Sequence, residues 1–399
     1  MAGSDHGPGS GSEPGPGDGM RVAVVGGGAV GVTAAYDLAV ADADVTLFEK
    51  GAVASGASGR AAGVLYDAYA EDIDAELGAR ALERFRRLSG TGEFTFTECP
   101  YVMFAREGDD DRAEAIRGAA ERMRVHDRDV ETIGGDELGE RFPSLHVDDV
   151  AVAAVAHNAG WTDPESYVTT VADLAASAGV EIRTDSEVAV STAPTGVTVA
   201  DEAPVTRRFD AVVVAAGAHT KRLLADAGIA VPLKPYRVQA LVSGRAFDGP
   251  MWYDASAGVY ARPHPTGLLA GDGTVPVEAD PDEWDRDADG WFLADVGETL
   301  RDRAGHDPDV ERAWAGLCTA TPDGDPLLGE VADGVLVAAG WQGHGFMRAP
   351  ATGEAIARQA LGERETVPGF DPGRFDGDEA FEISEGMAVE TDDGPERGC

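Results

Sequence analysis

Residues 22–31 read VAVVGGGAVG, and the fold class depends on them. Four apolar residues, typical of a short buried β-strand, run directly into the glycines. Gly26, Gly28 and Gly31 give the spacing GxGxxG, and the residues after them have the composition of a helix. A second strand is expected over residues 44–49. The stretch therefore predicts a strand, a glycine turn, a helix and a strand, which is a βαβ unit of an α/β, Rossmann-like fold.

Each glycine of the turn has its own role in such a unit. Gly26 allows the tight turn, Gly28 lets the backbone approach a pyrophosphate, and Gly31 lets the helix pack close to the sheet. The helix begins at Ala29 and Val30, where unpaired N–H groups and the positive end of the helix dipole favour phosphate.

Glu49 ends the second strand, 21 residues after Gly28. A carboxylate at this position accepts hydrogen bonds from the ribose hydroxyls and repels a 2′-phosphate, which disfavours NADP. The strand, the glycine turn, the helix, the second strand and the acid occur in the order and spacing of a dinucleotide site. The stretch therefore predicts such a site rather than a structural glycine turn.

The same stretch could be taken for a targeting signal, but its composition argues against this. Asp37 and Asp42 interrupt the apolar run, and residues 1–19 before it are rich in Gly, Pro and Ser, without a basic segment. We expect a disordered N-terminal extension over residues 1–19 and no membrane span.

The chain is strongly acidic. It has 72 acidic and 32 basic residues, a formal net charge of -40. A polyanionic surface argues against nucleic acid and anionic membranes as partners. Salt screens the self-repulsion of such a chain, which suggests a salt-rich cytoplasm as in a halophile. An acidic protein of an ordinary cytoplasm is the alternative.

The cysteines indicate a reducing compartment. Cys99, Cys318 and Cys399 are far apart and form no Cys/His metal spacing. We therefore expect a cytoplasmic protein with no disulfide framework and no metal site.

Buried parallel-type strands are scattered along the whole chain, so one domain must be assembled from separated pieces. The pieces of this dinucleotide-binding domain are 20–89, 151–227 and 321–365. The interleaved segments, expected to form an α+β substrate domain with a mostly antiparallel sheet, are 90–150 and 228–320. Residues 366–399 are expected to be an acidic flexible tail.

The acidic run 280–289, DPDEWDRDAD, is expected to be the solvated face of a helix. Trp284 within the run and Trp291 after it are expected in the core.

Five further stretches carry a resemblance to a known family. They are SGASGRAAG at 55–63, TDP at 162–164, VVVAAGAHT at 212–220, WAGLCTATPDGDPLLG at 314–329 and GWQGHGFMRA at 340–349. In this order and spacing, residues 20–362 resemble the FAD-dependent D-amino acid oxidase superfamily, especially its sarcosine oxidase, glycine oxidase and amino-acid dehydrogenase members. The resemblance implies FAD as the cofactor.

The resemblance also implies where FAD binds. The glycine turn, Glu49 and Lys50 would hold the ADP half, the loop 58–63 would lie along the isoalloxazine ring, and the loop opening the last helix would face the pyrimidine edge. The implied cofactor-binding residues are Gly26, Gly28, Ala29, Val30, Gly31, Glu49, Lys50, Ser58, Arg60, Ala61, Ala62, Gly63, Val188, Ala216, Gly217, Gly340, Gly343, His344, Gly345, Phe346 and Met347. Arg60 as a surface ion pair, His344 as a turn residue and Val188 as plain core are the alternatives.

The sequence departs from its relatives at the usual anchors. Cys318 stands where glycine oxidases carry the Arg that holds the substrate carboxylate, and Met347 where sarcosine oxidases carry a Lys. Gly316 stands near the position of the Cys that attaches flavin, so we expect non-covalent FAD. Leu269 replaces the oxygen-activating Lys, which favours a dehydrogenase using a quinone or other carrier over an oxidase using O2.

Replacement anchors are expected on the strand around residues 259–264. Tyr260 matches a Tyr that relatives place over the substrate, and Arg262 shares its face of the strand. The catalytic candidates are Tyr260, Arg262 and His344, with Arg262 holding a substrate anion and Arg348 as a weaker choice. The alternative for Arg262 is an ion pair with a local acid.

The resemblance implies hydride transfer from the carbon beside an amine to flavin N5, followed by hydrolysis of the imine. The substrate would be a small amino acid or N-methyl amino acid, and an oligomer is compatible with the sequence. A 2-hydroxy acid or glycerol-phosphate type dehydrogenase is one rival, which needs His264 or His344 as a base. A non-catalytic flavoprotein subunit and a simple NAD dehydrogenase are the others.

Overall fold

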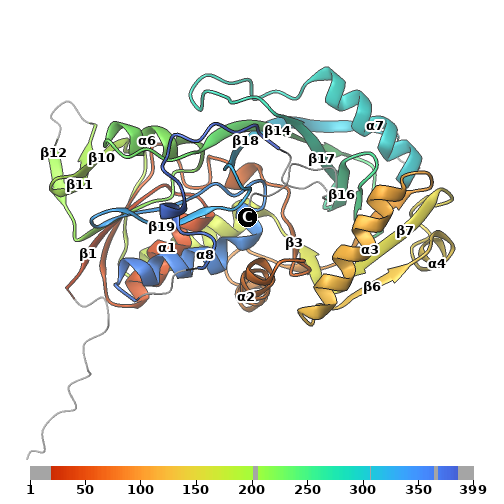
Figure 1. Ribbon diagram of the computed structural model, residues 1–399, viewed down its shortest axis with the longest axis horizontal. Helices are drawn as coiled ribbons and strands as arrows, with labels where there is room; N and C mark the ends of the chain where they lie inside the picture. The colour runs from red at the N-terminus through yellow and green to blue at the C-terminus, as the bar shows by residue number, and fades with distance from the viewer. Residues whose placement is uncertain (1–18, 201–204, 306, 364–366, 385–399) are drawn as a thin grey trace, which may run out of the picture.

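The structure is a computed structural model, and it describes residues 19–200, 205–305, 307–363 and 367–384. Two large β-sheets organise the chain, one in each half of the elongated molecule of Figure 1. Most of the extension expected over residues 1–19 lies outside the described residues. In the part of the chain that is described, every helix is too short or too polar to span a bilayer.

The first sheet has six strands in the order β19-β20-β13-β1-β2-β9. All neighbours pair in parallel except β19, which is antiparallel to β20. The strand bounds are β1 (Arg21–Val25), β2 (Asp44–Phe48), β9 (Glu181–Arg183), β13 (Ala211–Val214), β19 (Leu327–Ala332) and β20 (Val335–Ala339). The predicted Rossmann-like α/β fold is confirmed, with the strand before the glycine turn near the middle of the sheet.

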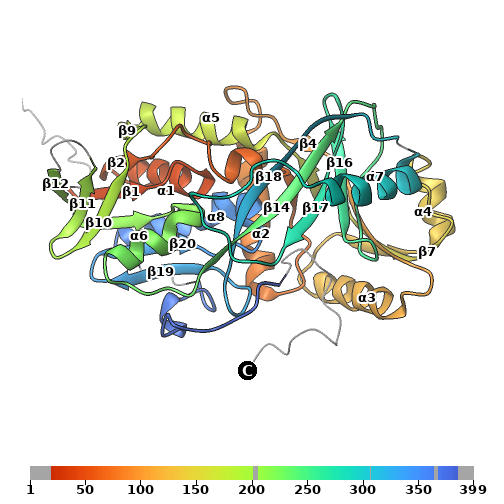
Figure 2. The ribbon, with the colours of Figure 1, turned by 90° about the horizontal axis from the view of Figure 1, so that it is seen from above.

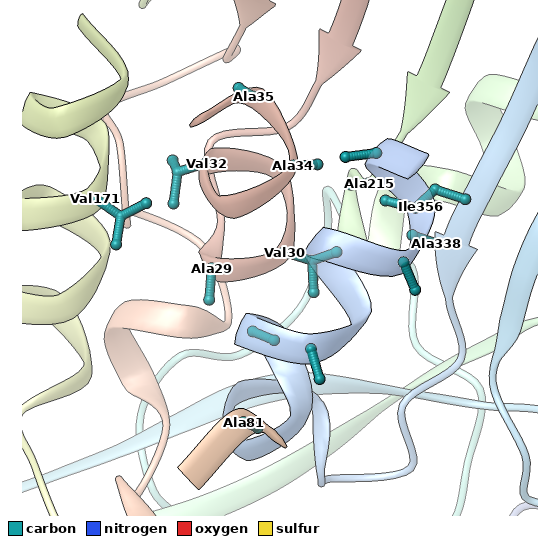
Figure 3. Packing of buried hydrophobic residues seen from close by; sticks show 14 of the residues in the cluster. Ala29, Val30, Val32, Ala34, Ala35, Ala81, Val171, Ala215, Ala338 and Ile356 are labelled. Carbon is teal, nitrogen blue, oxygen red and sulfur yellow. The ribbon is translucent and has the colours of Figure 1, made fainter. Parts of the chain in front are cut away.

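Helix α1 (Ala29–Val40) lies on this sheet between two other helices, α5 (Pro164–Ser177) and α8 (Gly345–Ala360), as Figure 3 shows close up. Apart from Leu38, its buried residues are small or β-branched, so its neighbours approach closely. A Cβ placed on Gly353 of α8 would lie 2.6 Å from the Cβ of Thr33 in α1. Helix α2 (Asp72–Leu88) packs against α8 in turn.

The second sheet has eight strands in the order β18-β14-β17-β16-β15-β5-β7-β6. It is antiparallel apart from the β15–β5 pair, which confirms the expected mostly antiparallel sheet. The bounds are β5 (Tyr101–Arg106), β6 (Val130–Ile133), β7 (Val150–Ala156), β14 (Lys234–Ser243), β15 (Met251–Asp254), β16 (Val259–His264), β17 (Gly267–Val275) and β18 (Val310–Ala320).

Smaller elements complete the chain. The helices are α3 (Asp110–Val125), α4 (Gly135–Arg141), α6 (Thr220–Asp226) and α7 (Gly290–Ala304), and the single 3-10 turns are η1 (Ser58–Arg60), η2 (Gly217–His219) and η3 (Pro372–Arg374). Two three-stranded sheets consist of β3 (Val64–Tyr66), β8 (Ala159–Trp161) and β4 (Thr97–Glu98), and of β10 (Val188–Thr192), β11 (Thr195–Val199) and β12 (Val205–Arg208). Seen from above in Figure 2, α1 and α5 run side by side over the first sheet, while α3 lies against β7 at the other end.

Two boundaries of the expected domains need correction. Residues 151–156 belong to β7, which pairs with β5 and β6 of the second sheet, so they lie outside the first domain. Residues 367–384 are not a solvated tail, because Phe370 is fully buried in the first domain's core and its carbonyl accepts from Leu328 N at 2.8 Å. An aromatic side chain in this otherwise acidic stretch has apolar surface to bury.

We predict that Gly353→Ala destabilises the protein although alanine is the better helix former. The added methyl group would press on Thr33, which we expect to cost about 1–3 kcal/mol. Gly118 in α3 is the matched control, because a Cβ added there would have only Arg122 Nη1 nearby, at 3.5 Å, among the described residues. Gly118→Ala should stabilise by about 0.5–1 kcal/mol. Urea unfolding measures both changes, and equal effects of the two variants would contradict the close packing of α1 on α8.

Candidate active site

A cavity of about 830 Å³ is lined by residues from both sheets. The first sheet contributes the ends of β1, β2 and β13, where the carboxyl ends of its parallel strands meet. The second sheet contributes residues of β14, β16, β17 and β18. Ligands of open α/β sheets bind at this edge, so the cavity lies where the sequence predicts a dinucleotide.

The glycine turn brings backbone to the wall of the cavity. Gly26 has φ of +116°, and a Cβ there would lie 2.4 Å from the carbonyl oxygen of Ala215. A Cβ on Gly31 would lie 2.0 Å from the Gly26 oxygen, which explains why α1 starts directly against the turn. Gly28 is the N-cap of α1 and has no side chain, and Ser58 Oγ accepts from Ala29 N at 2.9 Å. Gly28, Ala29 and Val30 line the cavity, so the start of this helix lies at its wall. These features fit a pyrophosphate.

Glu49 is fixed in position by the backbone around it. Its Oε2 accepts from Gly27 N at 2.7 Å and its Oε1 from Gly51 N at 2.8 Å. The carboxylate therefore stands just after the end of β2, on the cavity wall, where an acid of a dinucleotide site is expected. Lys50 also lines the cavity, and its Nζ lies 2.6 Å from His219 Nε2.

The start of α8 forms a second wall of the same cavity. Gly343, Gly345 and Phe346 line it, and the N-cap of α8 has no side-chain cap. Two helix N-termini therefore direct their positive ends toward one cavity, which suits an anion at each. The residues fit FAD, with a pyrophosphate at α1 and an electron-rich ring edge at α8.

Most of the cofactor candidates line the cavity. They are Gly26, Gly28, Ala29, Val30, Glu49, Lys50, Ser58, Arg60, Ala61, Ala62, Val188, Ala216, Gly217, Gly343, Gly345 and Phe346. Gly31, Gly63 and Gly340 lie behind the wall, where they allow close backbone contacts. A Cβ on Gly63 would lie 2.1 Å from Thr162 O, and one on Gly340 would lie 2.5 Å from Thr321 Cγ2.

His344 and Met347 also lie outside the lining. The His344 ring packs edge-on against Tyr69, with ring centroids 6.2 Å apart, and Met347 Sδ accepts from Tyr69 Oη at 2.5 Å. Burial, together with the nearby Arg348 guanidinium, lowers the pKa of His344 to about 3. His344, the N-cap residue of α8, is therefore not among the residues that line this cavity, in contrast to the expectation, because its ring packs against Tyr69.

Of the two anchors expected on β16, the structure brings only Tyr260 into the cavity. Arg262 is 3% exposed, and its guanidinium donates to the carbonyls of Ala62 and Pro263 and lies over the Trp161 ring. These contacts use its donors to hold the loop that lines the cavity. Only two of its five N–H donors have these partners, and Arg262 does not line the cavity, so its expected role as the holder of a substrate anion stays a prediction.

Arg348, the weaker candidate for holding the substrate anion, forms an ion pair within the protein. Its Nη1 pairs with Asp74 Oδ1 at 3.0 Å, and its guanidinium lies 5.0 Å from the Tyr69 ring centroid. It is buried and does not line the cavity.

Segment 280–289 lines the cavity, which sequence reasoning missed. The expected helix is absent, because Asp280 Oδ1 and Asp285 Oδ1 accept from the backbone N–H two residues on and so favour turns. Asp282 binds Lys50 and Arg222, which ties the segment to the first domain. Figure 1 shows it running above β14 and β18 toward α6.

Aromatic side chains of the cavity were also missed. Trp284, Trp314 and Trp341 line it, whereas Trp284 was expected in the core. Trp291, also expected in the core, is 47% exposed. Because tryptophans fill cores and binding sites alike, composition gave no signal to separate them.

Comparison with known proteins agrees with this geometry. Residues 21–359 match the model of the family described as FAD dependent oxidoreductase (DAO). The chain belongs to this family, so it is an FAD-dependent oxidoreductase, as the resemblance implied.

The individual relatives have low sequence identity to this chain. The chain is 28% identical over 357 residues to a glycine oxidase of Geobacillus kaustophilus (strain HTA426), covering 84% of this chain and 91% of that protein. It is 28% identical over 385 residues to 4-methylaminobutanoate oxidase (formaldehyde-forming) of Paenarthrobacter nicotinovorans, covering 90% of this chain but only 45% of that protein. The solved L-proline dehydrogenase from P.horikoshii superposes with a TM-score of 0.78 at 25% identity, covering 90% and 98% of the two chains.

We predict that Glu49→Gln weakens FAD binding about tenfold, because an amide offers one acceptor oxygen where Glu49 uses two. Fluorescence of free FAD during titration of the apoprotein measures the affinity. Glu187→Gln removes the same charge at the cavity wall, where in the described structure its carboxylate makes no hydrogen bond. This control should bind FAD like the unaltered protein, and equal losses would contradict the role of Glu49.

Proposed function

We propose that the protein oxidises the C–N bond of a small amino acid or N-methyl amino acid, with FAD held non-covalently. The observation that carries the proposal is the convergence of the two helix N-termini and Tyr260 on one cavity. The names of the relatives support the substrate class, since two are oxidases of an amino acid or a methylamino acid and one is a proline dehydrogenase.

In this proposal FAD, when bound, supplies the two-electron acceptor for a hydride from the carbon beside nitrogen. The residues of the chain bind FAD and the substrate and orient them. The start of α1 and the carboxylate of Glu49 hold the ADP half, and the N–H groups at the start of α8 stabilise negative charge at the ring edge they face. Tyr260 donates from β16 to the substrate. Water then hydrolyses the imine product to a carbonyl compound and the free amine or ammonia.

An amine substrate is favoured over an alcohol because neither histidine expected to act as a base reaches the cavity in the described chain. His219 does line the cavity, but its Nε2 contacts Lys50 and Asp282. A neutral amine can lose hydride without a protein base, whereas an alcohol needs its proton removed. Neither His264 nor His344 lines the cavity. Burial lowers the pKa of both, and for His344 to about 3, which makes that imidazole a weak base.

We assign the electrons to a carrier such as a quinone or a flavoprotein rather than to O2. The support is Leu269, which stands where related oxidases carry a lysine and which is 2% exposed, outside the cavity lining. We propose a cytoplasmic location for this activity, which is supported by Cys99 and Cys318, both free in the described structure.

The test is a visible spectrum of the holoprotein, taken without oxygen before and after adding sarcosine, glycine, proline or D-amino acids. Bleaching of the flavin by one of them is the expected result and identifies the substrate. Slow return of colour in air, with fast return on adding a quinone, supports the dehydrogenase. A flavin that no amine bleaches overturns the proposed reaction, and bleaching by a 2-hydroxy acid would replace it.

We predict that Tyr260→Phe slows anaerobic bleaching by the substrate about three- to tenfold, because one hydrogen bond to the substrate is lost. FAD content should not change. Tyr253→Phe removes a hydroxyl from the neighbouring position of β15, which pairs with Tyr260 but is buried outside the cavity. Stopped-flow absorbance compares the two variants, and a bleaching rate of Tyr260→Phe equal to that of Tyr253→Phe would argue against the contact.

A further inference from the structure

Two arginines line one end of the cavity, Arg60 of η1 and Arg286 of segment 280–289. Consecutive residues of β18 hold their main chains in place. Trp314 Nε1 donates to Arg60 O at 3.1 Å, and Ala315 N donates to Arg286 O at 2.8 Å. Burial and the neighbouring charge of Arg286 lower the pKa of Arg60, as expected for two guanidinium groups close together.

Neither guanidinium has a carboxylate partner among the described residues. Arg60 Nη1 donates to two backbone carbonyls, those of Ser55 and Gly56, and Arg286 lies over the ring of Trp284 at 5.4 Å. This is unexpected in a chain with 72 acidic and 32 basic residues. Two like charges that lie close together without an ion-pair partner lower their energy by sharing an anion.

Three carboxylates near Arg286 in the sequence contact other groups. Asp282 accepts from Arg222 at 2.5 Å, and Asp289 pairs with Arg237 at 3.2 Å. Asp285 Oδ1 accepts from the N–H of Asp287 at 3.0 Å. The segment is therefore held over the cavity by its acidic residues, while its single arginine stays available to a ligand.

We propose that Arg60 and Arg286 form an anion-binding subsite at the opening of the cavity, which takes the carboxylate or phosphate of a small molecule. Arg286 is exposed and Arg60 half-buried, so the pair extends from solvent into the cavity. Guanidinium groups bind such planar or tetrahedral oxyanions with two donors each. The anion belongs to the amino-acid substrate, in which case the inference rests on the proposed function, or to a negatively charged electron acceptor.

The first experiment measures the binding of glutarate and of inorganic phosphate to the oxidised holoprotein by calorimetry. We expect Arg286→Gln to weaken binding about tenfold, as for the loss of one charge-assisted contact. Arg312→Gln is the matched control, because Arg312 stacks on the Trp314 ring at 4.2 Å but does not line the cavity. No binding to the unaltered protein, or equal weakening in both variants, overturns the subsite.

The second experiment distinguishes the sources of the anion by rapid mixing. Slower anaerobic bleaching of Arg286→Gln by the amino acid assigns the subsite to the substrate. Slower reoxidation of photoreduced flavin by ferricyanide, an anion, with unchanged reoxidation by the cation phenazine methosulfate, assigns it to the acceptor. Rates equal to those of Arg312→Gln in all three reactions contradict the proposal.

FAD affinity is measured in parallel, since a loss confined to FAD binding would show that Arg286 serves the cofactor instead and would overturn the subsite. If no amine bleaches the flavin, the proposed function is refuted but the anion-binding subsite is not. The calorimetry and the reoxidation of photoreduced flavin would still decide the subsite, because neither needs the substrate.

Discussion

The close contact between the start of α1 and the end of β1 is the constraint on which the rest of the site depends. A single added carbon at Gly31 would meet the Gly26 carbonyl at 2.0 Å, so α1 must begin immediately at the turn. Gly353 allows the same closeness between α1 and α8. Because α8 cannot shift away from α1 without opening the core, the positions of the two helix N-termini on the cavity are linked. Packing of small residues thereby determines the electrostatics of the site.

The two sheets contribute different things to the cavity. The first contributes main-chain N–H groups, helix ends and the carboxylate of Glu49, which we expect to recognise the cofactor and to tolerate little change. The second contributes side chains, among them Tyr260 of β16, Trp314 of β18 and Tyr236 of β14. Segment 280–289 joins the halves, since Asp282 pairs with Arg222 while Arg237 donates to the carbonyl of Asp285 at 3.0 Å. Proteins with this fold that act on different substrates are therefore expected to differ in the side chains of the second sheet.

The sequence was sufficient for the cofactor half because local chemistry determines it. Residues 22–49 carry their own glycine turn, helix start and acid, and the structure shows each in the predicted place. Side-chain direction in the other half depends on packing that no local pattern records. Arg262 shares a strand face with Tyr260 yet turns to the carbonyl of Ala62, and His344 turns to Tyr69. Segment 280–289 was misassigned because a run of acids fits a solvated helix and a series of aspartate turns equally well.

The order in which the chain leaves the ribosome determines when this site can exist. Strand β1 is made early, but its neighbour β13 follows far along the chain, as the contact between Arg21 N and Asp210 across 189 residues shows. Helix α8, the second wall of the cavity, is made later still. The apolar strands β1 and β2 therefore lack their partner strands in the sheet during most of translation. Unpaired apolar strands are prone to aggregation. The acidic excess of the sequence acts during this interval too, since repulsion between nascent chains keeps them apart before folding buries the strands.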